Sequence, residues 1–145
     1  MSQGITEEAR RVIFSARAQA MHYGSLCIES EHILLAILDE REVQGHHLFG
    51  EDSSLELLKK EIKKNLAIHE SISGPVEVPL TLESKLILTL AFDEASELCH
   101  KQIGIEHLLI GILRCETCVA AKILSIHGAT IGEMRKHAIH RAQNQ

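Results

Sequence analysis

The feature that most constrains the fold of this chain is an internal repeat. Shifting the sequence by 75 positions aligns residues 6–39 with residues 81–114 without a gap, and ten of the 34 aligned pairs are identical. Self-similarity at one fixed offset indicates two copies of a structural unit about 70 residues long. The chain is therefore expected to fold as a duplicated unit.

The spacing of apolar residues indicates that both copies are helical. Apolar side chains recur every three or four positions, as at Ile33, Leu34, Ile37 and Leu38, and alternation of period two is not sustained. Each copy also places a threonine before a long amphipathic stretch, where a hydroxyl can cap a helix. The sequence predicts an all-α fold: two tandem pseudo-twofold four-helix repeats forming one eight-helix domain. The expected helices cover residues 6–22, 30–40, 43–49, 54–67, 81–98, 105–115, 118–127 and 130–142.

The stretch between the two copies breaks the helical pattern. It contains Gly74, Pro75 and Pro79, and the two prolines are the only ones in the chain. Such residues favour an extended linker. We expect a single domain over residues 1–145, with repeat one at 5–68, the linker at 69–80 and repeat two at 81–142.

Composition argues against several classes of protein. The net charge of −5 and the aromatic content of 3% disfavour a nucleic-acid-binding module, which needs cationic and stacking side chains. No apolar run approaches the ~20 residues of a membrane span, and the first residues do not resemble a secretion signal. The four cysteines are then expected to be reduced thiols in a cytoplasmic protein that needs no cofactor or structural metal.

The two copies share a specific motif around a Glu-His pair. The first copy reads Ile28-Glu-Ser-Glu-His-Ile-Leu-Leu-Ala-Ile-Leu38, and the second reads Ile103-Gly-Ile-Glu-His-Leu-Leu-Ile-Gly-Ile-Leu113. This pattern resembles the N-terminal domain of Clp ATPases, nearest to the ClpC type and then to ClpA, over residues 4–142. Residues 119–124 also resemble the family's third helix, whereas residues 43–49 lack its pair of small alanines.

The resemblance implies a binding module for protein degradation. In this family the domain lies ahead of the ATPase rings and receives protein substrates or adaptor proteins for the unfoldase and its protease. The sequence lacks a Gly-x-x-x-x-Gly-Lys-(Ser/Thr) phosphate loop, so no catalytic activity is expected of this chain. An alternative is a stand-alone accessory protein that binds and helps to assemble or regulate the Clp protease complex. The isolated domain is expected to be a monomer.

The resemblance also suggests a ligand, phosphoarginine, with one site per repeat. The matching positions are Thr6 with Glu31, and Thr81 with Glu106. The start of a helix attracts a phosphoryl group, while a carboxylate accepts hydrogen bonds from a guanidinium and repels a bare phosphate. Leu82 follows Thr81 where Glu7 follows Thr6, so the two sites need not bind equally.

Simpler interpretations of these residues remain open. A threonine before a helix is commonly only an N-cap, and a glutamate in a first turn commonly only complements the helix dipole. His32 and His107 are expected to tie the loop to the second helix through a ring N–H. Cys115 and Cys118 could form a redox pair or half of a zinc site, but no suitably spaced further ligands accompany them.

Overall fold

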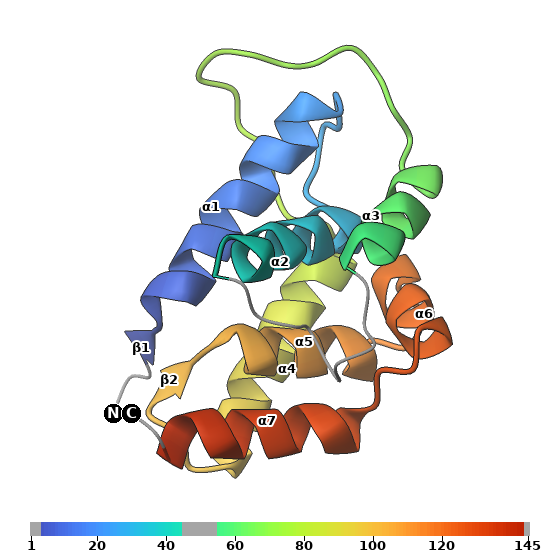
Figure 1. Ribbon diagram of the computed structural model, residues 1–145. Helices are drawn as coiled ribbons and strands as arrows, with labels where there is room; N and C mark the ends of the chain where they lie inside the picture. Colours follow the sequence, from blue (N-terminus) through green and yellow to red (C-terminus); the bar gives the residue numbers. More distant parts are fainter. Residues whose placement is uncertain (1–3, 45–54, 144–145) are drawn as a thin grey trace.

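The computed structural model describes residues 4–44 and 55–143, and within these ranges it contains seven helices and one pair of short strands (Figure 1). The all-α fold predicted from the repeat is confirmed. In chain order the elements are β1 (Gly4–Ile5), α1 (Glu7–His22), α2 (Ser30–Gln44), α3 (Leu55–Lys64), α4 (Leu82–Glu97), β2 (Gln102–Ile103), α5 (Ile105–Arg114), α6 (Val119–Ile126) and α7 (Ile131–Gln143).

One predicted helix differs from the structure in its placement. Helix α2 continues to Gln44, past its expected end near residue 40. The helix expected at 43–49 therefore begins inside α2, and its remaining residues lie outside the described ranges. The other seven helices occur within a few residues of their expected bounds.

The two long helices begin at the threonines that the repeat pointed to. Thr6 caps α1, with its Oγ1 accepting from the N–H of Ala9 at 3.1 Å. Thr81 caps α4, with its Oγ1 accepting from the N–H of Ser84 at 3.1 Å. Both capping residues have extended backbone, as an N-cap requires.

These caps give a direct stability test. Replacing Thr6 or Thr81 with alanine is expected to lower the free energy of unfolding by about 1 kcal/mol, because a helical N–H loses its acceptor. Serine at either position should restore most of that loss. In urea denaturation, Thr89→Ala is a suitable control, because Thr89 lies within α4 and its hydroxyl only donates to the carbonyl of Lys85. A loss in Thr89→Ala equal to that of the cap variants would contradict the capping role.

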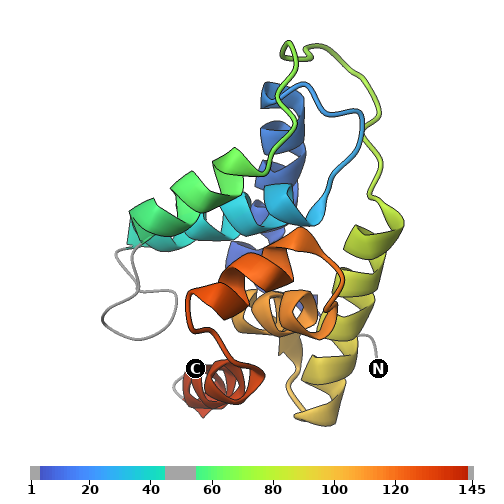
Figure 2. The ribbon, with the colours of Figure 1, turned by 90° about the vertical axis from the view of Figure 1, so that its right-hand side faces the viewer.

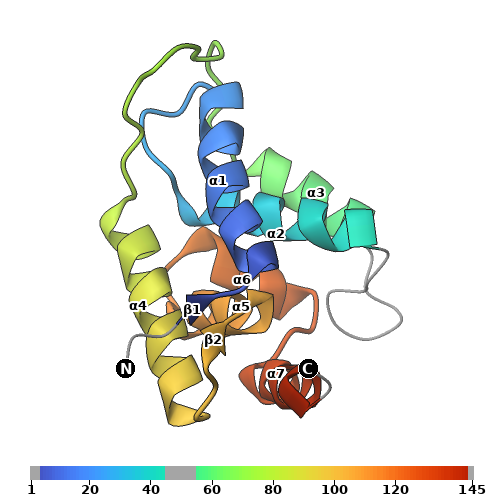
Figure 3. The ribbon, with the colours of Figure 1, turned by 90° about the vertical axis from the view of Figure 1, so that its left-hand side faces the viewer.

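Short parallel pairings interlock the two copies. β1 pairs with β2, Gly4 opposite Gln102 and Ile5 opposite Ile103, next to the start of α1 (Figure 3). In the same way Leu80, just before α4, pairs in parallel with Ile28, just before α2. The start of the first helix of each copy is therefore joined to the segment that precedes the second helix of the other copy.

The linker and α7 lie at opposite ends of the domain. The chain between α3 and α4 arcs over the C-terminal end of α1, and α7 lies at the far end in both views (Figures 1 and 2). Two backbone bonds attach the linker, from the N–H of His69 to the carbonyl of Tyr23 and from that of Ile72 to Met21, each at 2.8 Å. Gly24, at φ 73°, permits this approach, because a β-carbon there would lie 2.4 Å from the carbonyl oxygen of Glu70.

Helix α5 forms the centre of the core. Every residue from Ile105 to Leu113 is buried, and α5 packs against α4, α6 and α7. Helices α1 and α2 make the corresponding contact in the first copy. Because α5 is surrounded by other elements, the polar side chains in its first turn are held in fixed positions.

Candidate functional site

The structure brings Thr6 of the first copy beside Glu106 of the second. The N–H of Thr6 donates to the carbonyl of Ile103 at 3.0 Å, which places the start of α1 against the start of α5. Gly104 lies between the two side chains: a β-carbon there would be 3.7 Å from Cγ2 of Thr6 and 3.6 Å from Oε2 of Glu106. Thr6 and Glu106 therefore line one site across the boundary between the copies.

The sequence predicts that Thr6 pairs with Glu31 and that Thr81 pairs with Glu106. The structure shows that this prediction is wrong. Arg41, near the end of α2, contacts Glu8 beside Thr6, whereas Glu31 lies ten residues earlier, about 15 Å back along that helix. Thr81 is joined instead to the segment before Glu31, because its N–H donates to the carbonyl of Ile28 at 3.1 Å. The parallel pairings described above cause this exchange.

A cavity of about 580 Å³ opens beside Thr6 and Glu106. It is lined mainly by polar side chains from the starts of α1 and α5, the loop before β2, and α7. The lining includes Thr6, Glu8, His100, Lys101, Glu106, His107 and Arg141. The hydroxyl proton of Thr6 has no acceptor among the described residues and can be donated into this cavity.

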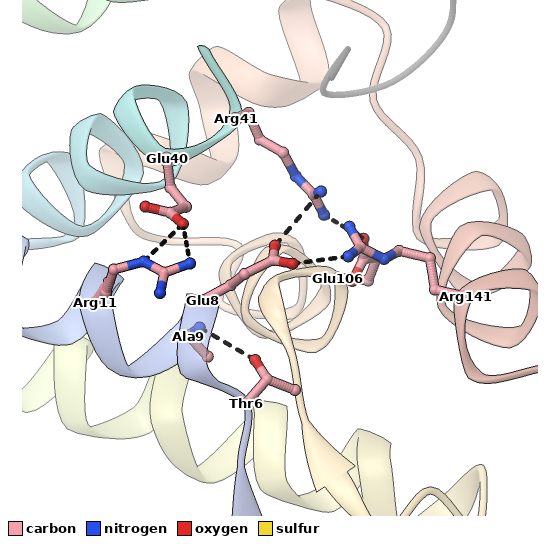
Figure 4. A network of polar contacts seen from close by, with 8 residues as sticks. All are labelled: Thr6, Glu8, Ala9, Arg11, Glu40, Arg41, Glu106 and Arg141. Carbon is pink, nitrogen blue, oxygen red and sulfur yellow. Dashed lines mark hydrogen bonds and ion pairs between the residues drawn. The ribbon is translucent and has the colours of Figure 1, made fainter. Parts of the chain in front are cut away.

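Two arginines hold the carboxylates of this site. Arg41 of α2 donates to Oε1 of Glu106, and Arg141 of α7 donates to the same oxygen at 3.2 Å (Figure 4). Arg141 also donates to Oε1 of Glu8 at 2.9 Å, and Arg41 lies 3.8 Å from the other oxygen of Glu8. Four helices thus meet at a cluster of two guanidinium groups and two carboxylates.

Sequence reasoning missed these arginines. Arg41 and Arg141 lie 65 and 35 residues from Glu106, and neither belongs to the repeated motif. A basic residue late in a helix is commonly explained by the helix dipole alone. Only the meeting of α2 and α7 over the start of α5 shows their role.

The second site, around Thr81 and Glu31, is acidic. Oε1 of Glu31 accepts from the hydroxyl of Ser30 at 2.7 Å, and within residues 4–44 and 55–143 no cationic group lies within ion-pair distance of it. Burial raises the pKa of the Glu29 carboxyl, and the charges of Glu31 and Glu83 raise it further. The hydroxyl of Thr81 donates to that of Ser84 at 3.0 Å.

The two histidines next to the glutamates have the structural role expected of them, but with the opposite hydrogen-bond direction. Nδ1 of His32 accepts from the N–H of Glu29 at 3.0 Å, and Nδ1 of His107 accepts from that of Gly104 at 2.9 Å. Burial lowers the pKa of both rings, and the charge of His100 lowers that of His107 further. A neutral ring then carries its proton on Nε2. Nε2 of His107 lies 2.8 Å from Nδ1 of His100.

The two cysteines between α5 and α6 form part of the core. Cys115 and Cys118 are 3% and 0% exposed, and burial raises the pKa of the Cys118 thiol to about 11. A thiol that stays protonated at neutral pH is a poor nucleophile and a poor metal ligand. No group of three or more metal-ligating side chains occurs among the residues that the structure places. The structure therefore gives no support to redox or zinc chemistry at this pair.

Known proteins match most of this chain. A model of the Clp repeat (R) N-terminal domain matches residues 4–127 and again residues 80–143. ClpC/MecB of Bacillus subtilis (strain 168), named a negative regulator of genetic competence, is 30% identical over 135 residues. Chloroplastic ClpC1 of Oryza sativa subsp. japonica is 33% identical over 140 residues. These alignments cover 92% and 96% of this chain but only 16% and 15% of the two relatives.

Solved structures share the fold at lower identity. The N-terminal domain of ClpD from Arabidopsis thaliana gives a TM-score of 0.73 at 20% identity, covering 94% of this chain and 96% of that one. The N-terminal domain of Hsp104 from Candida albicans gives 0.73 at 15% identity, covering 99% and 94%. This chain belongs to the Clp repeat N-terminal domain family, and the resemblance inferred from the Glu-His motifs is confirmed.

The chain spans about a sixth of the length of the curated relatives. None of the helices in residues 4–44 and 55–143 has both the length and the apolarity needed to cross a membrane.

Proposed function

We propose that this chain is a receiving module for a Clp-type unfoldase, which binds protein substrates or adaptor proteins and reads phosphoarginine as a degradation mark. The observation that carries the proposal is that each capping threonine is joined to the segment before the first-turn glutamate of the other copy. Thr6 approaches Glu106 in this way, and Thr81 is joined to the segment that leads into Glu31. This arrangement supports recognition of a group with two opposite charges.

The chemistry of each half of the site fits one half of phosphoarginine. The first turn of a 16-residue helix presents N–H groups without helical acceptors, and its positive dipole end favours a phosphoryl group. A carboxylate accepts charge-assisted hydrogen bonds from a guanidinium. Phosphoserine lacks the guanidinium and free arginine lacks the phosphoryl group, so neither satisfies both halves.

The proposed role is binding without catalysis. The sequence contains no phosphate-loop motif, and the family domain is not the ATPase module of a Clp protein. In this proposal, ATP hydrolysis and unfolding belong to other parts of the Clp machine, whether on the same polypeptide or on a partner.

Calorimetric titration with free phosphoarginine tests the proposal. We expect saturable binding of phosphoarginine and none of phosphoserine or arginine. Binding should be lost in a double variant, Glu31→Gln with Glu106→Gln, which removes both carboxylate charges while keeping the side-chain volume. Glutamine is preferable to alanine here because its amide oxygen can still accept from Arg41.

The control for this titration is the exposed acid Glu133, paired with Lys136 at 3.5 Å on α7. Glu133→Gln should bind as the unaltered chain does. If the folded chain gives no heat with phosphoarginine, the phosphoarginine proposal fails. Docking of an adaptor, or assembly of the Clp complex, would then be the better account of the domain.

A further inference from the structure

The two sites related by the repeat differ in the charge around the glutamate. Applying the offset of 75 residues, Glu8 corresponds to Glu83 and Glu106 to Glu31, so both sites keep their carboxylates. Two arginines, Arg41 and Arg141, donate to Glu106, whereas no arginine among the described residues donates to Glu31. One site is therefore neutralised by the chain itself, and the other is not.

At the Thr6 site the chain's own Arg141 binds both carboxylates. Arg141 donates to Glu106 at 3.2 Å and to Glu8 at 2.9 Å, its side chain is 33% exposed, and it lines the cavity. A ligand guanidinium would need the same carboxylate oxygens. Because Arg141 is held on α7 within the folded domain, it competes at the high effective concentration of a tethered group.

At the Thr81 site the competing bonds are weaker. Glu31 accepts from a neutral hydroxyl, that of Ser30, and Thr81 donates to another neutral hydroxyl, that of Ser84. Ser84 keeps its own bond to the carbonyl of Ile28 at 2.8 Å if Thr81 turns toward a ligand. Displacing a neutral hydroxyl from a carboxylate costs less than displacing a guanidinium, which carries the opposite charge.

We infer that the chain binds one phosphoarginine, at Thr81 and Glu31, and that Arg141 closes the site at Thr6 and Glu106 by occupying its carboxylates. The inference rests on the proposed function and adds an autoinhibitory contact to it. Helix α7 then controls access to the Thr6 site: any partner that draws Arg141 away from Glu8 and Glu106 opens that site.

The stoichiometry of phosphoarginine binding in calorimetry tests the inference. The unaltered chain is expected to bind one equivalent, which Glu31→Gln abolishes and Glu106→Gln leaves in place. Arg141→Gln is expected to raise the affinity of the Thr6 site by at least about tenfold and to reveal a second equivalent, because even one charge-assisted contact changes binding on that scale and Arg141 makes two. Adding Glu106→Gln to Arg141→Gln should remove the second equivalent again.

Lys136 provides the matched control for Arg141. Lys136→Gln removes the same charge from an exposed position of α7 and should leave one equivalent. Two equal sites in the unaltered chain, or one equivalent in a folded Arg141→Gln variant, would overturn the inference while leaving the proposed function intact. Absence of binding in every folded variant would overturn the proposed function, and the inference with it.

Discussion

Replacing Gly111 with alanine is expected to lower the free energy of unfolding by about 2–3 kcal/mol, although alanine is the better helix former. Gly111 lies in the middle of α5, where this helix crosses α4. A β-carbon at this position would lie 2.5 Å from the carbonyl oxygen of Ile87 and 3.1 Å from the backbone nitrogen of Ala91. Both atoms belong to the backbone of α4, so the clash can be relieved only by moving one helix away from the other.

Gly132 provides the matched control for this prediction. It lies in α7, and a β-carbon there would meet nothing within 4 Å. Gly132→Ala should therefore leave stability unchanged or raise it by up to about 1 kcal/mol. Urea denaturation of both variants gives the comparison. If Gly111→Ala also stabilises the protein, α4 and α5 do not approach each other closely enough at Gly111 to exclude a β-carbon.

The helices were predictable because their signal is local. Apolar spacing identified them, and the duplicated threonines marked where α1 and α4 begin. The histidine contacts were predictable in part, since a side chain at the third helical position can reach back to the residue before the helix. The direction of those bonds was not, because either ring nitrogen of a neutral histidine can accept.

The pairing of the site residues was not predictable from the repeat. An alignment of two copies shows which residues correspond but not which copy supplies the neighbour. In the structure the start of each first helix pairs with the segment before the second helix of the other copy, so its threonine is placed near the glutamate of that other copy. The arginines at Glu106 required the placement of α2 and α7, which depends on packing of the whole chain rather than on any local pattern.

The repeat also conserves contacts while changing their chemistry. Glu94 and Arg114 correspond to Gln19 and Asp39. In the second copy the contact is an ion pair at 3.4 Å, and in the first it is a hydrogen bond from the Gln19 amide to the Asp39 carboxylate at 2.6 Å. The position, one turn from the crossing of the two helices, thus requires a polar link rather than a particular charge.

Glu94→Gln is expected to lower the free energy of unfolding at pH 7 by about 2 kcal/mol, and the loss should shrink as the pH falls. Glu94 is 1% exposed on α4, and Arg135 of α7 donates to its two oxygens at 2.7 and 3.0 Å. Glutamine keeps the volume but loses the charge. The two arginines are partly exposed, so water offsets some of the cost.

The pH dependence follows from the charge that surrounds this carboxylate. The hydrogen bond from Arg135 lowers the pKa of Glu94, and the charges of Arg135 and Arg114 lower it further, against the opposing effect of burial. An acid whose pKa is lowered by folding stabilises the protein above its unfolded pKa, and that contribution is lost as the pH falls through the folded value. Urea denaturation of the unaltered chain and of Glu94→Gln should therefore give free energies of unfolding that differ most at pH 7 and converge toward pH 3. A difference that stays constant from pH 7 to pH 3 would show that the ion pair does not set the effect, and that the amide is poorly accommodated for steric reasons.

Because Arg135 and Arg141 lie on the same helix, loss of the Glu94 contact also weakens the attachment of α7. By the inference above, the same variant should bind more phosphoarginine at the Thr6 site, which links the stability of α7 to access to that site.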